Sequence, residues 1–125
     1  MTRAVFALHG FTGRPAGFDV LRAMHPDARF VTPALLGHGA AVNVRTFDDE
    51  VERLCDLSGS LEGAILLGYS LGGRLALAML ARGAKFARAV IIGASAGLAT
   101  ETERASRRAD DARLAALLRT EGVEA

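Results

Sequence analysis

The sequence has very little cysteine. Among its 125 residues Cys55 is the single one, so the chain cannot form an internal disulfide. Cys55 falls in a helical pattern, and we interpret it as a small buried apolar residue rather than a reactive thiol. The apolar run near the N-terminus is only five residues long, too short for a signal peptide. Together these features predict a cytoplasmic protein.

Long apolar runs and an excess of one charge are missing as well. The most apolar region, 64–81, is interrupted by Gly68, Ser70 and Arg74, so we predict no membrane-spanning helix. The formal net charge is +1, which provides no basic field for nucleic acid. The sequence also lacks metal-ligand spacing, a phosphate-binding loop and a dinucleotide fingerprint. We therefore predict no metal, no cofactor, no nucleic-acid partner and no membrane partner.

What the sequence does contain is a regular alternation of two patterns. Short runs typical of buried strands occupy 4–8, 29–32, 64–67 and 89–92. Helical patterns occupy 18–24, 46–57, 71–82 and 100–118. Alternating strands and helices predict an α/β protein with a mainly parallel sheet and helices on both faces.

Threonines mark two of the helix starts. Thr46 precedes a run of acidic residues, and Thr100 with Glu103 matches a capping box. The inner face of the helix at 46–57 is expected to consist of Phe47, Val51, Leu54 and Cys55.

The stretch Gly68-Tyr69-Ser70-Leu71-Gly72 fits G-x-S-x-G, the pattern of a nucleophile elbow between a strand and a helix. A serine on such a tight turn needs small residues two positions away, and glycines stand there. The hydroxyl of Ser70 then projects above the start of the next helix, where the N–H of Leu71 favours negative charge. A glycine-rich turn used only for packing is the alternative.

The loop after the first strand supports the elbow. An oxyanion hole needs a second N–H donor from a neighbouring loop, and Phe11 in His9-Gly10-Phe11 is the candidate. His9 is then a residue that shapes this loop. Of the other histidines, we expect His25 to be exposed and His38, between two glycines, to be structural.

These motifs resemble the α/β-hydrolase superfamily and, within it, the MenH-type lyases of menaquinone biosynthesis, which eliminate pyruvate to give 2-succinyl-6-hydroxy-2,4-cyclohexadiene-1-carboxylate. The stretches that carry the resemblance are HGFTG at 9–13, LLGHG at 35–39, FDD at 47–49, GYSLGGR at 68–74 and GLATETERASRRADD at 97–111. The resemblance covers essentially the whole chain but only about the N-terminal half of such an enzyme. It implies an α/β-hydrolase core at 1–99, without its C-terminal part, and the start of a helical cap at 100–125.

The resemblance also implies roles for particular residues. Ser70 would be the catalytic serine, Phe11 and Leu71 the oxyanion donors, and Tyr69, Arg74 and Arg107 the residues that contact a small anionic substrate.

From the residues alone, each arginine has both a functional and a structural interpretation. Arg74 lies one helical turn after Ser70, so it either clamps a substrate carboxylate or pairs with a buried structural carboxylate. Arg107 either faces the pocket from a cap helix or belongs to a solvated face, where Glu103 would be its partner at i,i+4. Tyr69 either lines the pocket or packs.

A base for Ser70 is missing from the sequence. On this fold the acid and the histidine of the triad follow the serine, and no histidine follows position 70. Asp110 and Asp111 lie in the expected cap helix rather than at a strand end. We therefore expect the isolated chain to be inactive, because a serine without a base is a poor nucleophile.

Three functions stay open at this point: a MenH-like lyase, a serine hydrolase of esters or C–C bonds, and a non-catalytic binding module. The fourth strand would also be an apolar sheet edge. We expect it to pair with a second copy of the chain or with a missing C-terminal half.

Overall fold

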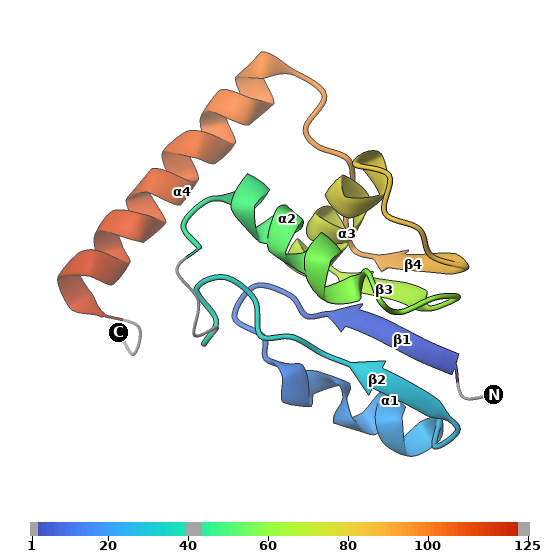
Figure 1. The fold of residues 1–125 in the computed structure, drawn as a ribbon. Helices are drawn as coiled ribbons and strands as arrows, with labels where there is room; N and C mark the ends of the chain where they lie inside the picture. The colour runs from blue at the N-terminus through green and yellow to red at the C-terminus, as the bar shows by residue number, and fades with distance from the viewer. Residues whose placement is uncertain (1–2, 40–43, 123–125) are drawn as a thin grey trace. The chain divides into compact units, whose positions relative to one another are not determined.

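Four parallel strands form one sheet in the order β2-β1-β3-β4 (Figure 1). The computed structural model describes residues 3–39 and 44–122. The strands are β1 (Arg3–Leu8), β2 (Ala28–Val31), β3 (Ile65–Tyr69) and β4 (Arg88–Ile92). The helices are the 3-10 turn η1 (Pro15–Phe18), α1 (Asp19–Met24), α2 (Phe47–Ser58), α3 (Leu71–Ala81) and α4 (Glu101–Glu121). The predicted α/β architecture with a parallel sheet is confirmed.

The chain divides into two compact units, one ending at Ser95 and the other beginning at Ala96. The first unit contains the sheet with α1 on one face and α2 and α3 on the other (Figure 1). The second contains α4. None of the described helices is both long enough and apolar enough to cross a membrane.

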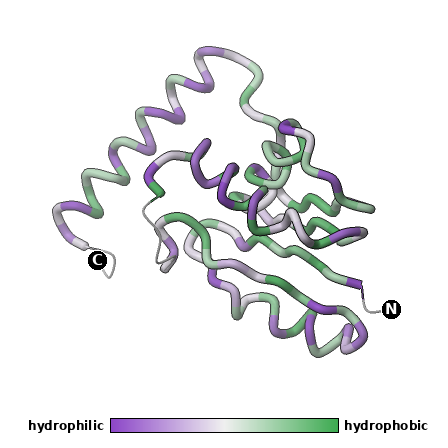
Figure 2. Tube along the Cα trace, viewed as in Figure 1, coloured by the Kyte–Doolittle hydropathy of each residue, from purple (hydrophilic) through white to green (hydrophobic). Residues whose placement is uncertain are grey.

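The main core lies between the sheet and the helices α2 and α3. Alternate residues of the central strands point into it. Figure 2 shows that β1 and β3 consist mainly of hydrophobic residues. Its fully or almost fully buried members are Phe6, Leu8, Leu35, Val51, Leu54, Leu66, Leu75, Ala76 and Met79. Cys55 is half-buried beside this cluster, and burial raises the pKa of its thiol. The thiol therefore stays protonated, in keeping with a packing role.

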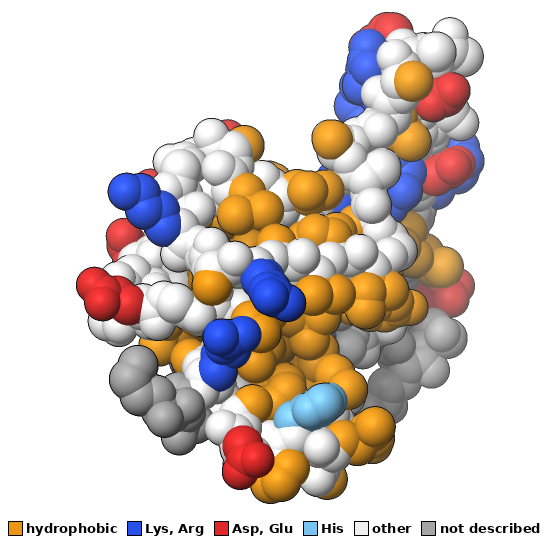
Figure 3. Space-filling view, turned by 90° about the vertical axis from the view of Figure 1, so that its right-hand side faces the viewer, with side chains coloured by type: hydrophobic (Ala, Val, Ile, Leu, Met, Phe, Trp, Pro, Cys, Tyr) orange, Lys and Arg blue, Asp and Glu red, His pale blue; other side chains and the backbone are white. Residues whose placement is uncertain are grey.

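The opposite face of the sheet is covered only in part. Phe18 and Leu21 pack against Val5 and Ala7 of β1. The same face of β3 and β4 carries Tyr69, Val90 and Ile92, whose exposed fractions are 53%, 46% and 50%. A side view shows hydrophobic side chains gathered on the surface with only a few Lys and Arg side chains among them (Figure 3).

The inner face of α2 differs from the prediction. Phe47 is 38% exposed, whereas Glu50 is 1% exposed and Ser58 is buried with Val51 and Leu54. The sequence period places Phe47 inward, but it is the first residue of the helix and extends past the core. Thr46 does cap α2, because its hydroxyl accepts from the N–H of Asp49 at 3.1 Å.

Element ends shift by a few residues elsewhere. The helix predicted at 18–24 begins earlier, as the turn η1 at Pro15, because proline suits the first helical position. The helix predicted to end near 118 continues to Glu121, and Thr100 caps it by accepting from Glu103 N–H at 3.1 Å.

We predict that the uncovered face and the outer edge of β4 make the 125-residue chain self-associate. Val90→Lys should shift the chain toward monomer, because a charge on the exposed face opposes its burial against a second copy. Val20→Lys is the matched control, since Val20 is an equally apolar residue of α1 with 69% exposure. Light scattering after size exclusion measures the mass, and a monodisperse monomer of the unaltered chain would contradict the prediction.

Candidate active site

Ser70 occupies a strained turn between β3 and α3. Its φ of 53° and ψ of −113° lie in a region that residues with a side chain rarely adopt. The N–H of Ser70 donates to the carbonyl of Ile92 at 2.9 Å, and the carbonyl of Ser70 accepts from the N–H of Arg74 at 3.0 Å. The turn is therefore held from β4 on one side and from α3 on the other. This is the backbone geometry of a nucleophile elbow.

Two glycines make the turn possible through close approach of backbone. A Cβ on Gly68 would lie 2.6 Å from the carbonyl oxygen of Gly72. A Cβ on Gly72 would lie 2.1 Å from the carbonyl oxygen of Leu8, at the end of β1. Both distances are far below any van der Waals contact, so the small residues expected on either side of Ser70 are sterically required.

The loop after β1 lies directly beside the elbow. A Cβ on Gly10 would meet the ring of Tyr69 at 2.9 Å, and a Cβ on Gly72 would also lie 2.6 Å from the carbonyl oxygen of His9. Among residues 3–39 and 44–122, neither Phe11 nor Leu71 donates its N–H to another residue. An oxyanion hole requires two N–H donors without other partners, and the role assigned to Phe11 and Leu71 stays a prediction.

Tyr69 and Arg74 flank Ser70 with exposed side chains. The guanidinium carbon of Arg74 lies 5.8 Å from the centre of the Phe47 ring, a cation–π contact. In the part of the chain that the structure describes, Arg74 forms no ion pair, so the alternative of a structural carboxylate partner finds no support there. The cation is exposed and can receive an anion.

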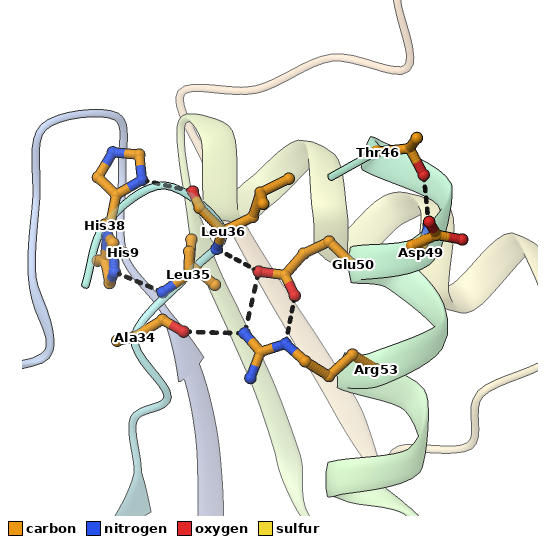
Figure 4. A network of polar contacts seen from close by, with 9 residues as sticks. All are labelled: His9, Ala34, Leu35, Leu36, His38, Thr46, Asp49, Glu50 and Arg53. Carbon is orange, nitrogen blue, oxygen red and sulfur yellow. Dashed lines mark hydrogen bonds and ion pairs between the residues drawn. The ribbon is translucent and has the colours of Figure 1, made fainter. Parts of the chain in front are cut away.

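A buried polar network supports the loops around the elbow (Figure 4). Glu50 accepts from the N–H of Leu36 and from Arg53, and the Arg53 guanidinium also donates to the carbonyl of Ala34 at 2.9 Å. Arg53 offsets the cost of burying the carboxylate of Glu50. Neither residue is predicted from the sequence, because Glu50 looks like one more acid in the first turn of a helix. In the sequence, only the i,i+3 spacing of Glu50 and Arg53 indicates that the two side chains pair.

The second unit holds Arg107 in a different pairing from the one expected. Its Nε donates to Asp111 at 3.0 Å instead of pairing with Glu103.

Other arginines of α4 also pair within the helix. Hydrogen bonds from Arg108 and Arg104 lower the pKa of Glu101 at the start of α4. No residue of α4 is buried. The predicted contact of Arg107 with substrate stays a prediction.

None of the three histidines serves Ser70 in the described structure. His25 is exposed, as predicted. His9 is 4% exposed, and His38 is half-buried; the ring nitrogens of both hydrogen-bond to backbone groups. The structural role predicted for His38 is confirmed by these bonds.

A strained serine elbow at the end of the central strand of a parallel sheet defines the α/β-hydrolase class. The sequence model of the alpha/beta hydrolase family matches residues 5–124, and the chain belongs to this family.

More particular similarities exist within that family. The chain is 33% identical over 132 aligned residues to the putative 2-succinyl-6-hydroxy-2,4-cyclohexadiene-1-carboxylate synthase of Bacillus subtilis, covering 99% of this chain and 48% of that protein. It is 34% identical over 123 residues to the synthase of that name from Escherichia coli, covering 94% and 49%. The solved structure of MenH from S. aureus superposes with a TM-score of 0.87 at 25% identity, covering 99% and 50%. The chain spans about half the length of these relatives.

We predict that Gly72→Ala destabilises the protein strongly. The added methyl group would overlap backbone of β1, which cannot move as a flexible side chain can. The loss should reach about 3 kcal/mol, the upper range for overpacking in a core. Gly17→Ala is the control, because a Cβ there meets nothing within 4 Å and the φ of Gly17 is not positive. Urea unfolding measures both, and similar losses for the two variants would refute the steric argument.

Proposed function

We propose that this chain provides the serine-bearing part of a MenH-like carbon–oxygen lyase. In this reaction, pyruvate is eliminated from a carboxylate-rich cyclohexene intermediate of menaquinone biosynthesis. The observation that carries the proposal is the elbow of Ser70 with an exposed Arg74 one helical turn away, which has no ion-pair partner among the described residues. The similarity to synthases named for the product of this reaction supports it.

We propose a role for each group of the site. Ser70 acts at the reacting centre, and the N–H groups of Phe11 and Leu71 stabilise negative charge that develops on a substrate oxygen. Arg74 receives a carboxylate, for which a guanidinium has the matching fork of donors. The Phe47 ring limits the orientations of Arg74, so less side-chain freedom is lost when the anion binds. Tyr69, next to Ser70, is proposed to contact the substrate as well, and the same role for Arg107 rests on the sequence resemblance alone.

No histidine follows Ser70 in the sequence, and Asp110 and Asp111 lie in α4 rather than at a strand end. We propose that the base and the acid come from additional polypeptide, and that the 125 residues alone retain only the weak catalysis that oxyanion donors supply without a triad.

Two other functions use the same site. A serine hydrolase of esters or C–C bonds would need Ser70 and the oxyanion donors but no cation for an apolar substrate. A non-catalytic binding module is favoured by the engagement of both His9 and His38 with backbone, which leaves neither ring free to act as a base.

Ser70 should react with an organophosphonate probe. We expect slow labelling at one site per chain, because the elbow exposes the hydroxyl beside oxyanion donors while the base is lacking. Ser70→Ala should abolish the labelling, and Ser106→Ala, in the exposed face of α4, should leave it unchanged. Intact-mass spectrometry gives the stoichiometry. Absence of labelling in a folded sample would count against both enzymatic functions for this chain.

Arg74 should distinguish the lyase from a hydrolase of apolar esters. Arg74→Gln should weaken the binding of 2-succinyl-6-hydroxy-2,4-cyclohexadiene-1-carboxylate, the dicarboxylate for which the relatives are named, by about tenfold. This is the value of one charge-assisted hydrogen bond. Arg74→Lys should recover part of the affinity. Arg22→Gln is the control, because Arg22 is an exposed arginine of α1 that pairs with Asp19. Calorimetry measures Kd, and equal affinities for Arg74→Gln and the unaltered chain would remove the lyase assignment.

A further inference from the structure

Two histidines connect the loop that carries Phe11 to the loop that follows β2. Nε2 of His38 accepts the N–H of Thr12 at 2.9 Å. In the opposite direction, Nε2 of His9 accepts the N–H of Leu35 at 3.2 Å. Each loop therefore carries one histidine whose ring accepts a backbone N–H of the other loop. The centres of the two rings lie 5.2 Å apart. Figure 4 shows the histidines side by side with the loop of Ala34, Leu35 and Leu36.

The other ring nitrogens determine the protonation state. Nδ1 of His9 lies 2.9 Å from the carbonyl oxygen of Gly10, and Nδ1 of His38 lies 2.9 Å from that of Leu36. A carbonyl oxygen only accepts and a backbone N–H only donates, so in both rings Nδ1 carries the proton and Nε2 is bare. A second proton would have to go to Nε2 and would abolish the bonds to Thr12 and Leu35.

The bond to Thr12 holds a residue that is strained. Thr12 has a φ of 64°, which is unfavourable for a β-branched side chain. It directly follows Phe11, whose own ring meets the His38 ring edge-on at 5.7 Å. His38 thus contacts both the ring of Phe11 and the N–H of the next residue, Thr12. The N–H of Gly13 closes the turn by donating to the carbonyl of Gly10 at 2.9 Å.

We propose that His9 and His38 form a histidine clasp that positions the Phe11 loop for oxyanion binding, and that protonation of the clasp releases this loop. The clasp is the pair of Nε2 bonds to Thr12 and Leu35. Both histidines are positioning residues, since neither touches Ser70. The effect on catalysis rests on the function proposed above, whereas the release of the loop by acid does not.

Few charged groups of the described residues face the clasp. His9 is influenced by His38 from the second loop and by Glu50 from α2, and Arg53 pairs with that carboxylate. Burial is the largest influence and lowers the pKa of His9 from its ordinary 6.5; the bond to Gly10 opposes this, His38 adds to it and Glu50 opposes it. A histidine with a lowered pKa binds fewer protons in the folded state. Its stabilising contribution is therefore complete above pH 6.5 and is lost as the pH falls below that value.

Nuclear magnetic resonance of the 15N-labelled chain tests the clasp without any substrate. In each neutral imidazole the proton should lie on Nδ1. As the pH is lowered below 6.5, the protection factors of the Thr12 and Leu35 amides should fall about tenfold, as expected for the loss of one hydrogen bond each. The amide of Ala87, which bonds to Ala64 away from the clasp, should keep its protection.

Variants separate the two histidines. In His38→Gln the side-chain oxygen can still accept from Thr12 but does not titrate, so protection of Thr12 should become independent of pH while that of Leu35 still falls. His25→Gln, at an exposed histidine, should behave as the unaltered chain. A proton on Nε2 of either ring at neutral pH, or pH-independent protection of Thr12 in the unaltered chain, would overturn the proposal.

Labelling of Ser70 by the phosphonate probe gives a separate readout. If the clasp positions the oxyanion loop, the labelling rate should fall more steeply with acid in the unaltered chain than in His38→Gln. Parallel rate profiles in the two proteins would refute the positioning role. If Ser70 is not labelled but the amides titrate as expected, the catalytic function fails and the release of the loop by acid stands.

Discussion

The site depends on the contact between the end of β1 and the start of α3. The backbone of Gly72 lies so close to the carbonyl of Leu8 that no side chain fits between them. This contact fixes where the first turn of α3 begins, and with it the direction in which Ser70 leaves the sheet. The positive φ of Ser70 is a consequence, since β3 must turn sharply to reach a helix that starts there. The loop of Phe11 follows Leu8 and is therefore brought beside the serine by the same contact.

Local patterns are enough to predict most of this architecture. The strands, the parallel sheet, the elbow and the two threonine caps all depend on residues that are close in sequence, so period and capping signals identify them. The elbow is the clearest example, because its glycines, its serine and its flanking apolar runs occur together within a few residues.

Features that depend on distant contacts cannot be predicted in the same way. The buried carboxylate of Glu50 accepts an N–H from the loop that follows β2, and nothing near Glu50 in the sequence indicates that loop. Phe47 turns outward and lies under Arg74, a residue of another helix. The structural role of His38 is predicted correctly, but its partner Thr12 lies 26 positions away. Tertiary contacts of this kind decide the polar part of the site.

One hydrogen bond connects the strand at the sheet edge to the serine. The N–H of Ser70 is held by the carbonyl of Ile92, the last residue of β4, while the outer side of β4 has no neighbour among the described strands. The strand that would receive a partner at this edge is therefore the same strand whose last carbonyl holds the turn of Ser70, so assembly and nucleophile geometry share one element.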